Sequence, residues 1–302
     1  MPTAIYNNAR SFIYRNARPL DFARWRYFFE NGSAQDVLCA LAAYQNADGG
    51  FGHGLEADCL NPDSTPIQTW SATMILRSID LYDPEHPIVS GIVRYLESGA
   101  AFDGHCWAWS IPSNNDHPHA SWWHHQEPDP NAQRNYNPTA SLAGWLLRVS
   151  GSDFAWRIAH EAVDHYLSSG RCNDMHLLPC ILCLYRDIAR VAPEEFDISA
   201  LEEKLRDDIT VCLEQTADCW GGYCALPSDY ISGREDSFLS CAPELAQKEC
   251  EYIARTQLPN GAWKVSWNWG GYPEDFAVSA NRWQSHIIIK NLLFLRGMGA
   301  EL

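Results

Sequence analysis

Two acidic side chains, Glu56 and Asp58, follow the glycine-rich stretch YQNADGGFGHGLEADC at residues 44–59. They lie between two apolar helical segments and could reach a site at the start of the second one. A carboxylate near a helix N-terminus tends to stay ionised, whereas a carboxylate desolvated by aromatic rings has a raised pKa. The pair could therefore divide the roles of proton donor and proton acceptor. The alternative is that both acids only cap or solvate the loop.

The segment from residue 105 to residue 125, HCWAWSIPSNNDHPHASWWHH, holds four tryptophans and five histidines. We interpret it as an aromatic pocket wall in which His119 is available for proton transfer. Tryptophan faces can stabilise a carbocation or grip a sugar ring. The alternative is a loop packed by its own rings. The histidine spacing fits no zinc template, so we predict no metal or cofactor and leave Zn²⁺ and Mg²⁺ open.

Further candidates lie in the last third of the chain. Asp229 and Tyr230 follow a proline-containing turn, and Trp283 and His286 share one face of a helical segment. A histidine on an apolar helix is also a common core residue. The predicted catalytic residues are therefore Glu56, Asp58, His119 and Asp229. The predicted substrate-binding residues are Trp107, Trp109, Trp122, Trp123, Tyr230, Trp267, Trp283 and His286.

The elements that must position these residues are helices. Ten segments carry the apolar period of a helix, and none alternates with period two long enough to indicate a sheet. Residues 199–214 are amphipathic, with an apolar face made of Leu201, Leu205, Ile209 and Cys212. Others are apolar almost all round, as buried helices are: residues 66–79, 139–149 and 277–297. This alternation predicts an all-α fold, a double-layered α/α toroid of helical hairpins with roughly ten helices in one domain, residues 1–302.

The connections between these segments are unequal in length. Links from apolar to amphipathic segments are short, whereas those from amphipathic to apolar segments span residues 45–65, 99–138 and 257–275. Loops longer than about 15 residues within a compact domain are usually functional or disordered. Because these loops are rich in tryptophan, we expect them to be ordered and to form the site at one end of the barrel.

The glycine-rich stretch recurs along the chain. Gln45-x3-Gly49-x-Phe51 matches Gln257-x3-Gly261-x-Trp263, and a degenerate copy begins at Gln215. Glycine permits the positive φ that ends a helix, and the glutamine side chain can bond exposed backbone groups. This repeat resembles that of the terpenoid cyclase and protein prenyltransferase β-subunit superfamily. It is also similar to stand-alone bacterial proteins with a QNxDGGFGxGLExD motif.

The resemblance implies an α/α toroid with an aromatic central cavity. The chain departs from the superfamily's catalytic motifs, since it has no Asp-x-Asp-Asp box. Asp207-Asp208 lacks the third acid of a Mg²⁺-diphosphate box, and we expect it on a solvated face. Asp236, Cys241 and His286 are the residue types of the prenyltransferase zinc site, but their context differs. The resemblance therefore indicates the fold more specifically than it indicates the reaction.

Composition limits the classes of function. The formal net charge is −16 without a block of Lys or Arg, so we expect no nucleic-acid partner. No segment has the roughly 18 apolar residues of a membrane span. The eleven scattered cysteines and the lack of a signal sequence indicate a cytoplasmic protein.

We predict an enzyme that acts on an isoprenoid-like apolar small molecule by proton transfer and carbocation stabilisation, and leave its oligomeric state open. One alternative is a carbohydrate-active hydrolase or lyase, because α/α barrels also hold such enzymes and tryptophan platforms with paired acids suit sugars. Another is a non-catalytic binding scaffold. An apolar site would favour the isoprenoid-like substrate, whereas a hydrogen-bonding site would favour the carbohydrate.

Overall fold

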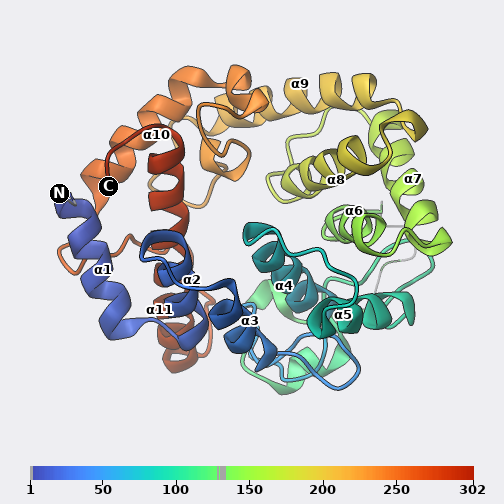
Figure 1. Cartoon of the computed structure of the whole chain (residues 1–302), viewed down its shortest axis with the longest axis horizontal. Helices are drawn as coiled ribbons and strands as arrows, with labels where there is room; N and C mark the ends of the chain where they lie inside the picture. Colours follow the sequence, from blue (N-terminus) through green and yellow to red (C-terminus); the bar gives the residue numbers. More distant parts are fainter. Residues whose placement is uncertain (1–2, 128, 130–133) are drawn as a thin grey trace. The chain divides into compact units, whose positions relative to one another are not determined.

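The computed structural model describes residues 3–127, 129 and 134–302. Within these ranges the chain forms eleven α-helices and no β-strand, only isolated bridges (Figure 1). The prediction of an all-α fold is therefore confirmed. None of the helices in the described ranges combines the length and apolar character that a bilayer crossing requires. The helices are α1 (Ala4–Asn16), α2 (Pro19–Phe29), α3 (Ala34–Ala42), α4 (Pro66–Ser78), α5 (Pro87–Glu97), α6 (Thr139–Val149), α7 (Asp153–Ser168), α8 (Leu177–Val191), α9 (Ile198–Thr216), α10 (Pro243–Thr256) and α11 (Pro273–Gly297).

All ten predicted segments are helical, and the eleventh helix, α1, was not predicted. Thr3 caps α1 by accepting a hydrogen bond from the Tyr6 backbone N–H. Only Ala9, Phe12 and Ile13 of this helix are buried. Three apolar positions among many polar ones leave little periodicity to detect, so the helix depends on packing against its neighbours rather than on its own pattern.

Short-range interactions set the starts of two other helices. Ser33 accepts from the Asp36 N–H at 3.1 Å, and the Asp36 carboxylate accepts from the Ser33 N–H at 3.4 Å. This reciprocal pair satisfies two free donors at the start of α3. Thr65 caps α4 in a similar way, and Pro66 occupies its first turn, where the missing N–H costs nothing.

The chain forms two compact units. Unit 1 combines both ends of the sequence, Met1–Leu41 and Ile209–Leu302, and unit 2 is the segment between them, Ala42–Asp208. In unit 2 every residue of α6 except Arg148 is buried, and α6 packs against α7 and α8. A buried ion pair links helices of this unit, since Arg77 contacts Asp187 at 2.6 Å.

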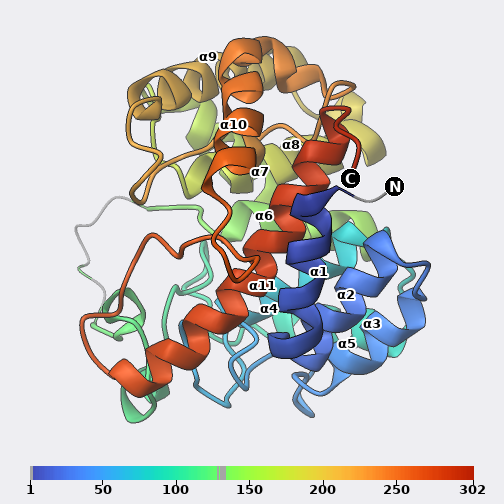
Figure 2. The same ribbon diagram turned by 90° about the vertical axis from the view of Figure 1, so that its left-hand side faces the viewer.

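In unit 1, α1, α2 and α11 lie side by side (Figures 1 and 2). The 25-residue α11 is less buried than its sequence suggested. Val278 is 50 % exposed, and Trp283, His286 and Lys290 are only partly covered. The expectation that residues 277–297 are buried almost all round is therefore wrong for the first half of this helix. The amphipathic assignment of α9 is confirmed, because the four residues of its apolar face are all buried.

The repeated turn joins each helix end to another helix. The Gln45 side-chain amide donates to the Gly49 carbonyl at 2.9 Å and to Ile88 in the first turn of α5 at 3.0 Å. Gln257 donates in the same way to Gly261 and to Ile5 in the first turn of α1. The expected role of the glutamine is therefore confirmed in both copies.

A shorter turn was not predicted. The Asp103 N–H donates to the Cys106 carbonyl three residues further on, whereas the Asn46 N–H donates to the Gly50 carbonyl four residues further on. Gly104 has a φ of +100°, but no glutamine precedes this turn and it is not a copy of the repeat.

We expect Gly49→Ala to lower the free energy of unfolding by roughly 3 kcal/mol or more. Gly49 has a φ of +98°, and a Cβ there would lie 2.0 Å from the Gly91 carbonyl oxygen. The matched control is Gly104→Ala, which has φ of +100° but no atom within 4 Å of the new Cβ. It should cost only about 1 kcal/mol, from backbone strain alone. Equal losses in urea unfolding of the two variants would contradict this account.

Candidate functional site

Two long loops of unit 2 form one layer. The segment that carries Glu56 and Asp58 pairs with the segment that carries His119. The Leu60 N–H donates to the Pro118 carbonyl at 3.0 Å, the Ala120 N–H donates to that of Asp58 at 2.8 Å, and Cys59 faces His119 in an antiparallel bridge. Three of the four predicted catalytic residues therefore belong to one paired segment. We call residues 52–64 and 108–125 the loop layer.

Buried amide side chains hold the loop layer together. Asn61 donates to Asn114 at 2.8 Å, and Asn114 donates to the Trp123 carbonyl at 2.9 Å. Gln68 of α4 donates to the Asn61 carbonyl and accepts from the Leu55 N–H. All three amide side chains are fully buried. Sequence reasoning missed them because an isolated Asn or Gln carries no local signal of burial.

Glu56 and Asp58 are 7 % and 3 % exposed. Glu56 accepts a hydrogen bond from the Asp58 N–H at 3.0 Å, so at least one of the acids also stabilises the turn. Burial raises the pKa of the neighbouring Cys59 thiol to about 12, and the charges of Glu56 and Asp58 add to this shift. Cys59 is therefore a protonated thiol and no nucleophile at neutral pH.

His119 and His124 form a directed pair of imidazoles. The rings stack with centroids 5.3 Å apart. Nδ1 of His119 lies 2.6 Å from the His117 carbonyl oxygen, which can only accept, so this nitrogen carries the proton. Nε2 of His119 then accepts from Nδ1 of His124 at 3.2 Å. In the neutral pair this leaves Nε2 of His124 unprotonated, on a side chain that is exposed. The sequence did not single out His124 among the five histidines of this segment.

The tryptophans of this region have different environments. Trp109 and Trp122 are 40 % and 43 % exposed. Ser110 contacts His125, its hydroxyl lying 3.3 Å from Nδ1, which brings the segment of Trp109 beside that of Trp122. Trp107, in contrast, is buried against Phe102 and Phe154, in a packing position. The Trp123 indole N–H is buried without an acceptor in the described part of the chain.

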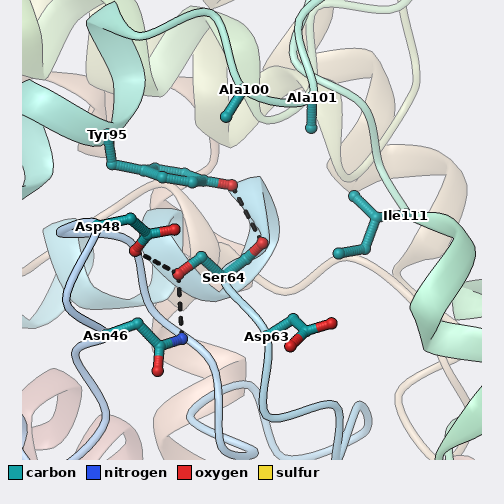
Figure 3. Close-up of a pocket in the computed structure, with 8 residues that line it drawn as sticks. All are labelled: Asn46, Asp48, Asp63, Ser64, Tyr95, Ala100, Ala101 and Ile111. Atoms are coloured by element: carbon teal, nitrogen blue, oxygen red, sulfur yellow. Dashed lines mark hydrogen bonds between the residues drawn. The ribbon is translucent and has the colours of Figure 1, made fainter.

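A shallow pocket of about 410 Å³ also opens in unit 2 (Figure 3). Ser64 donates to Asp48 at 2.7 Å and accepts from the Asn46 amide, and Tyr95 donates to the Ser64 carbonyl. The Asp63 carboxylate lies on the side of Ser64 that faces away from Asp48 (Figure 3). None of the predicted site residues lines this pocket. In the described residues no group of three or more His, Cys, Asp or Glu side chains could hold a metal ion.

Unit 1 holds the other predicted residues. Asp229 forms an ion pair with Lys290 of α11, and Tyr230 is buried, its hydroxyl 3.6 Å from the Cys212 thiol. Trp267 and Trp283 form an edge-to-face pair with centroids 5.1 Å apart, and His286 lies next to Trp283. The predicted proximity of Trp283 and His286 is therefore confirmed, whereas the sequence did not connect Asp229 with them.

Glu249 was missed by the sequence analysis. It is fully buried on α10 and accepts from both the hydroxyl and the N–H of Ser228, at 2.5 and 2.8 Å. Burial raises the pKa of Glu249 to about 7, although Lys290 and Ser228 lower it. Such a carboxyl can change protonation state near neutral pH.

No protein-family model, curated protein or solved structure matches this chain. The comparisons thus assign no activity.

We expect the buried Glu249 to make the stability of the protein depend on pH. Its folded pKa of about 7 exceeds the ordinary value of 4.5, so the native state retains a proton that the unfolded state releases. The free energy of unfolding should therefore fall as the pH rises from about 4.5 to 7, by roughly 3 kcal/mol at most. Glu249→Gln keeps the shape and should lose this contribution. Parallel pH profiles of the two proteins in urea unfolding would contradict the assignment.

Proposed function

We propose that the protein is an acid–base enzyme that binds a small-molecule substrate on the loop layer of unit 2. The observation that supports this most directly is the His119–His124 pair. His119 is held by the His117 carbonyl and in turn holds His124. His124 thereby presents Nε2 as a base of fixed orientation, which is what proton transfer to or from a bound substrate requires.

The pair also orients the base, because the His124 Nδ1–H donates to Nε2 of His119. The buried acids Glu56 and Asp58 lie on the segment paired with His119 and add negative charge to the same layer. His124 would act on the substrate, and His119 would hold the His124 ring in position.

A carbohydrate or similar polyhydroxylated ring fits this layer best. Trp109 and Trp122 expose about two-fifths of their surface, which suits stacking against a sugar ring. The exposed imidazole of His124 belongs to the same layer as these rings, so the layer offers a hydrogen-bonding group beside its aromatic surfaces. This favours a hydrolase or lyase acting on carbohydrate, the class that sequence analysis placed second.

An isoprenoid-like apolar substrate is the second candidate. In unit 1 the rings of Tyr223, Trp267 and Trp283 form a row, with successive centroids 5.5 and 5.1 Å apart. Aromatic faces stabilise a developing cation. The resemblance of the Gln-x3-Gly repeat to that of terpenoid cyclases and prenyltransferases supports the same class.

We also propose a toroidal arrangement of the helices and a cytoplasmic location. A closed α/α toroid is supported by the two glutamine turns, each of which ties the end of one helix to the start of another. A cytoplasmic protein without a nucleic-acid partner is supported by the eleven free cysteines of the described residues and the net charge of −16.

The first test is turnover of a panel of p-nitrophenyl glycosides. We expect release of p-nitrophenolate from at least one of them, and His124→Gln should lower kcat roughly 100-fold or more. His119→Gln should lower kcat less and shift the pH–rate profile, since it acts through His124. The control is His125→Gln, which alters the adjacent imidazole and should stay near wild type. Consumption of an isoprenoid diphosphate without glycoside turnover would replace the first candidate by the second.

Glu56→Gln and Asp58→Asn provide a separate test of the acids. We expect each to abolish turnover while changing the melting temperature little, because amides keep the shape and some of the hydrogen bonds of carboxylates. Full activity in both variants rules the acids out as catalysts. Loss of folding instead assigns them to the stability of the loop that begins at Gln45.

A further inference from the structure

The shallow pocket of unit 2 has two unlike walls (Figure 3). One wall is polar and carries the carboxylates of Asp48 and Asp63. The other wall is apolar and consists of Ala100, Ala101 and Ile111. The volume of about 410 Å³ is within the range of small-molecule sites, which combine an apolar lining with a few placed polar groups. Such a pair of walls is complementary to a molecule with one charged end and a short apolar body.

The polar wall is fixed without a ligand. The Asp48 carboxylate accepts from the Ser64 hydroxyl at 2.7 Å and from the Gly50 N–H at 2.9 Å. The Asp63 N–H donates to the side-chain oxygen of the buried Asn61 at 2.9 Å. Because these bonds already hold the chain beside both acids, little of the pocket needs to be ordered when a ligand binds, which favours affinity.

The two carboxylates of the pocket differ in their partners. Besides its two hydrogen bonds, Asp48 has a cation nearby, since the Arg94 guanidinium donates to the Asp48 backbone carbonyl at 3.2 Å. Among the described residues the Asp63 carboxylate has neither a hydrogen bond nor an ion pair, and it points toward the side of the pocket on which Ile111 lies (Figure 3). Two carboxylates beside one guanidinium leave a single negative charge without a partner, and Asp63 carries it.

We propose that this pocket binds a small organic amine as its ammonium ion. The ammonium group would donate to the Asp63 carboxylate, and charge-assisted hydrogen bonds of this kind are about twice as strong as neutral ones. The ammonium ion also carries the one positive charge that the pocket lacks. The alkyl body of the amine would cover Ala100, Ala101 and Ile111, which removes apolar surface from water.

A divalent metal ion fits this pocket less well than an amine. Ca²⁺ takes about six to eight oxygen ligands, whereas Asp48 and Asp63 lie on different sides of Ser64 (Figure 3). In the part of the chain that the structure describes, no group of three or more His, Cys, Asp or Glu side chains could hold a metal ion. The amine site also goes beyond the proposed function, because neither His119 nor His124 lines it.

The test is titration of the full chain with n-pentylamine and with its neutral analogue 1-pentanol, followed by saturation-transfer difference NMR. We expect saturable binding of the amine and roughly fivefold weaker binding of the alcohol. Asp63→Asn keeps the shape of the side chain but removes its charge, and should weaken binding of the amine to the level of the alcohol. This variant should fold like wild type, because the Asp63 carboxylate has no bond to lose. His124→Gln should bind the amine like wild type, which separates this test from that of catalysis.

Asp116→Asn is the matched control. Asp116 is an exposed residue of the loop layer that does not line the pocket, so this variant changes the net charge equally and should bind the amine like wild type. The proposal is overturned if the amine does not saturate in the millimolar range, if the alcohol binds equally well, or if Asp63→Asn binds the amine like wild type. An equal loss of binding in Asp116→Asn would also overturn it. Displacement of the amine by Ca²⁺ at lower concentration than by methylammonium would overturn it in favour of a metal site.

Discussion

The structure depends on one constraint. Its long connections must pair their buried backbone N–H and C=O groups although they form neither a sheet nor a helix. A buried N–H or C=O without a partner costs free energy comparable to a lost hydrogen bond. Here side-chain amides provide the partners. Gln45 and Gln257 close their turns and bond the next helix, while Asn61 and Asn114 connect the loop layer. Order in the loops therefore comes from a few amides whose bonds are made within the protein.

This constraint carries over to the chemistry of unit 2. Because amides already tie the loop layer together, His119 and His124 need not hold the loops, and their nitrogens form a directed relay instead. Trp109 and Trp122 are partly exposed in the same layer. A site on loops usually lacks the precision of one on helices, and buried hydrogen bonds restore some of that precision.

In unit 1 the buried charged side chains are held in a different way. Its polar side chains project from helices α2 and α11, where the backbone groups are already paired. Arg24, His286 and Lys290 are thus held by the scaffold and not by loop turns. The carboxylates and imidazoles of unit 2, in contrast, lie in the loop layer.

The sequence by itself determined the ten periodic helices, the cap at Ser33 and the glutamine turns, because each depends on residues a few positions apart. It also placed Glu56, Asp58 and His119 in neighbouring loops. It did not indicate α1, the turn at Gly104, or the roles of His124 and Glu249. Only the tertiary structure decided these, and it alone brought Arg24 to His286, because such contacts join residues far apart in the chain and leave no local periodicity or spacing to read.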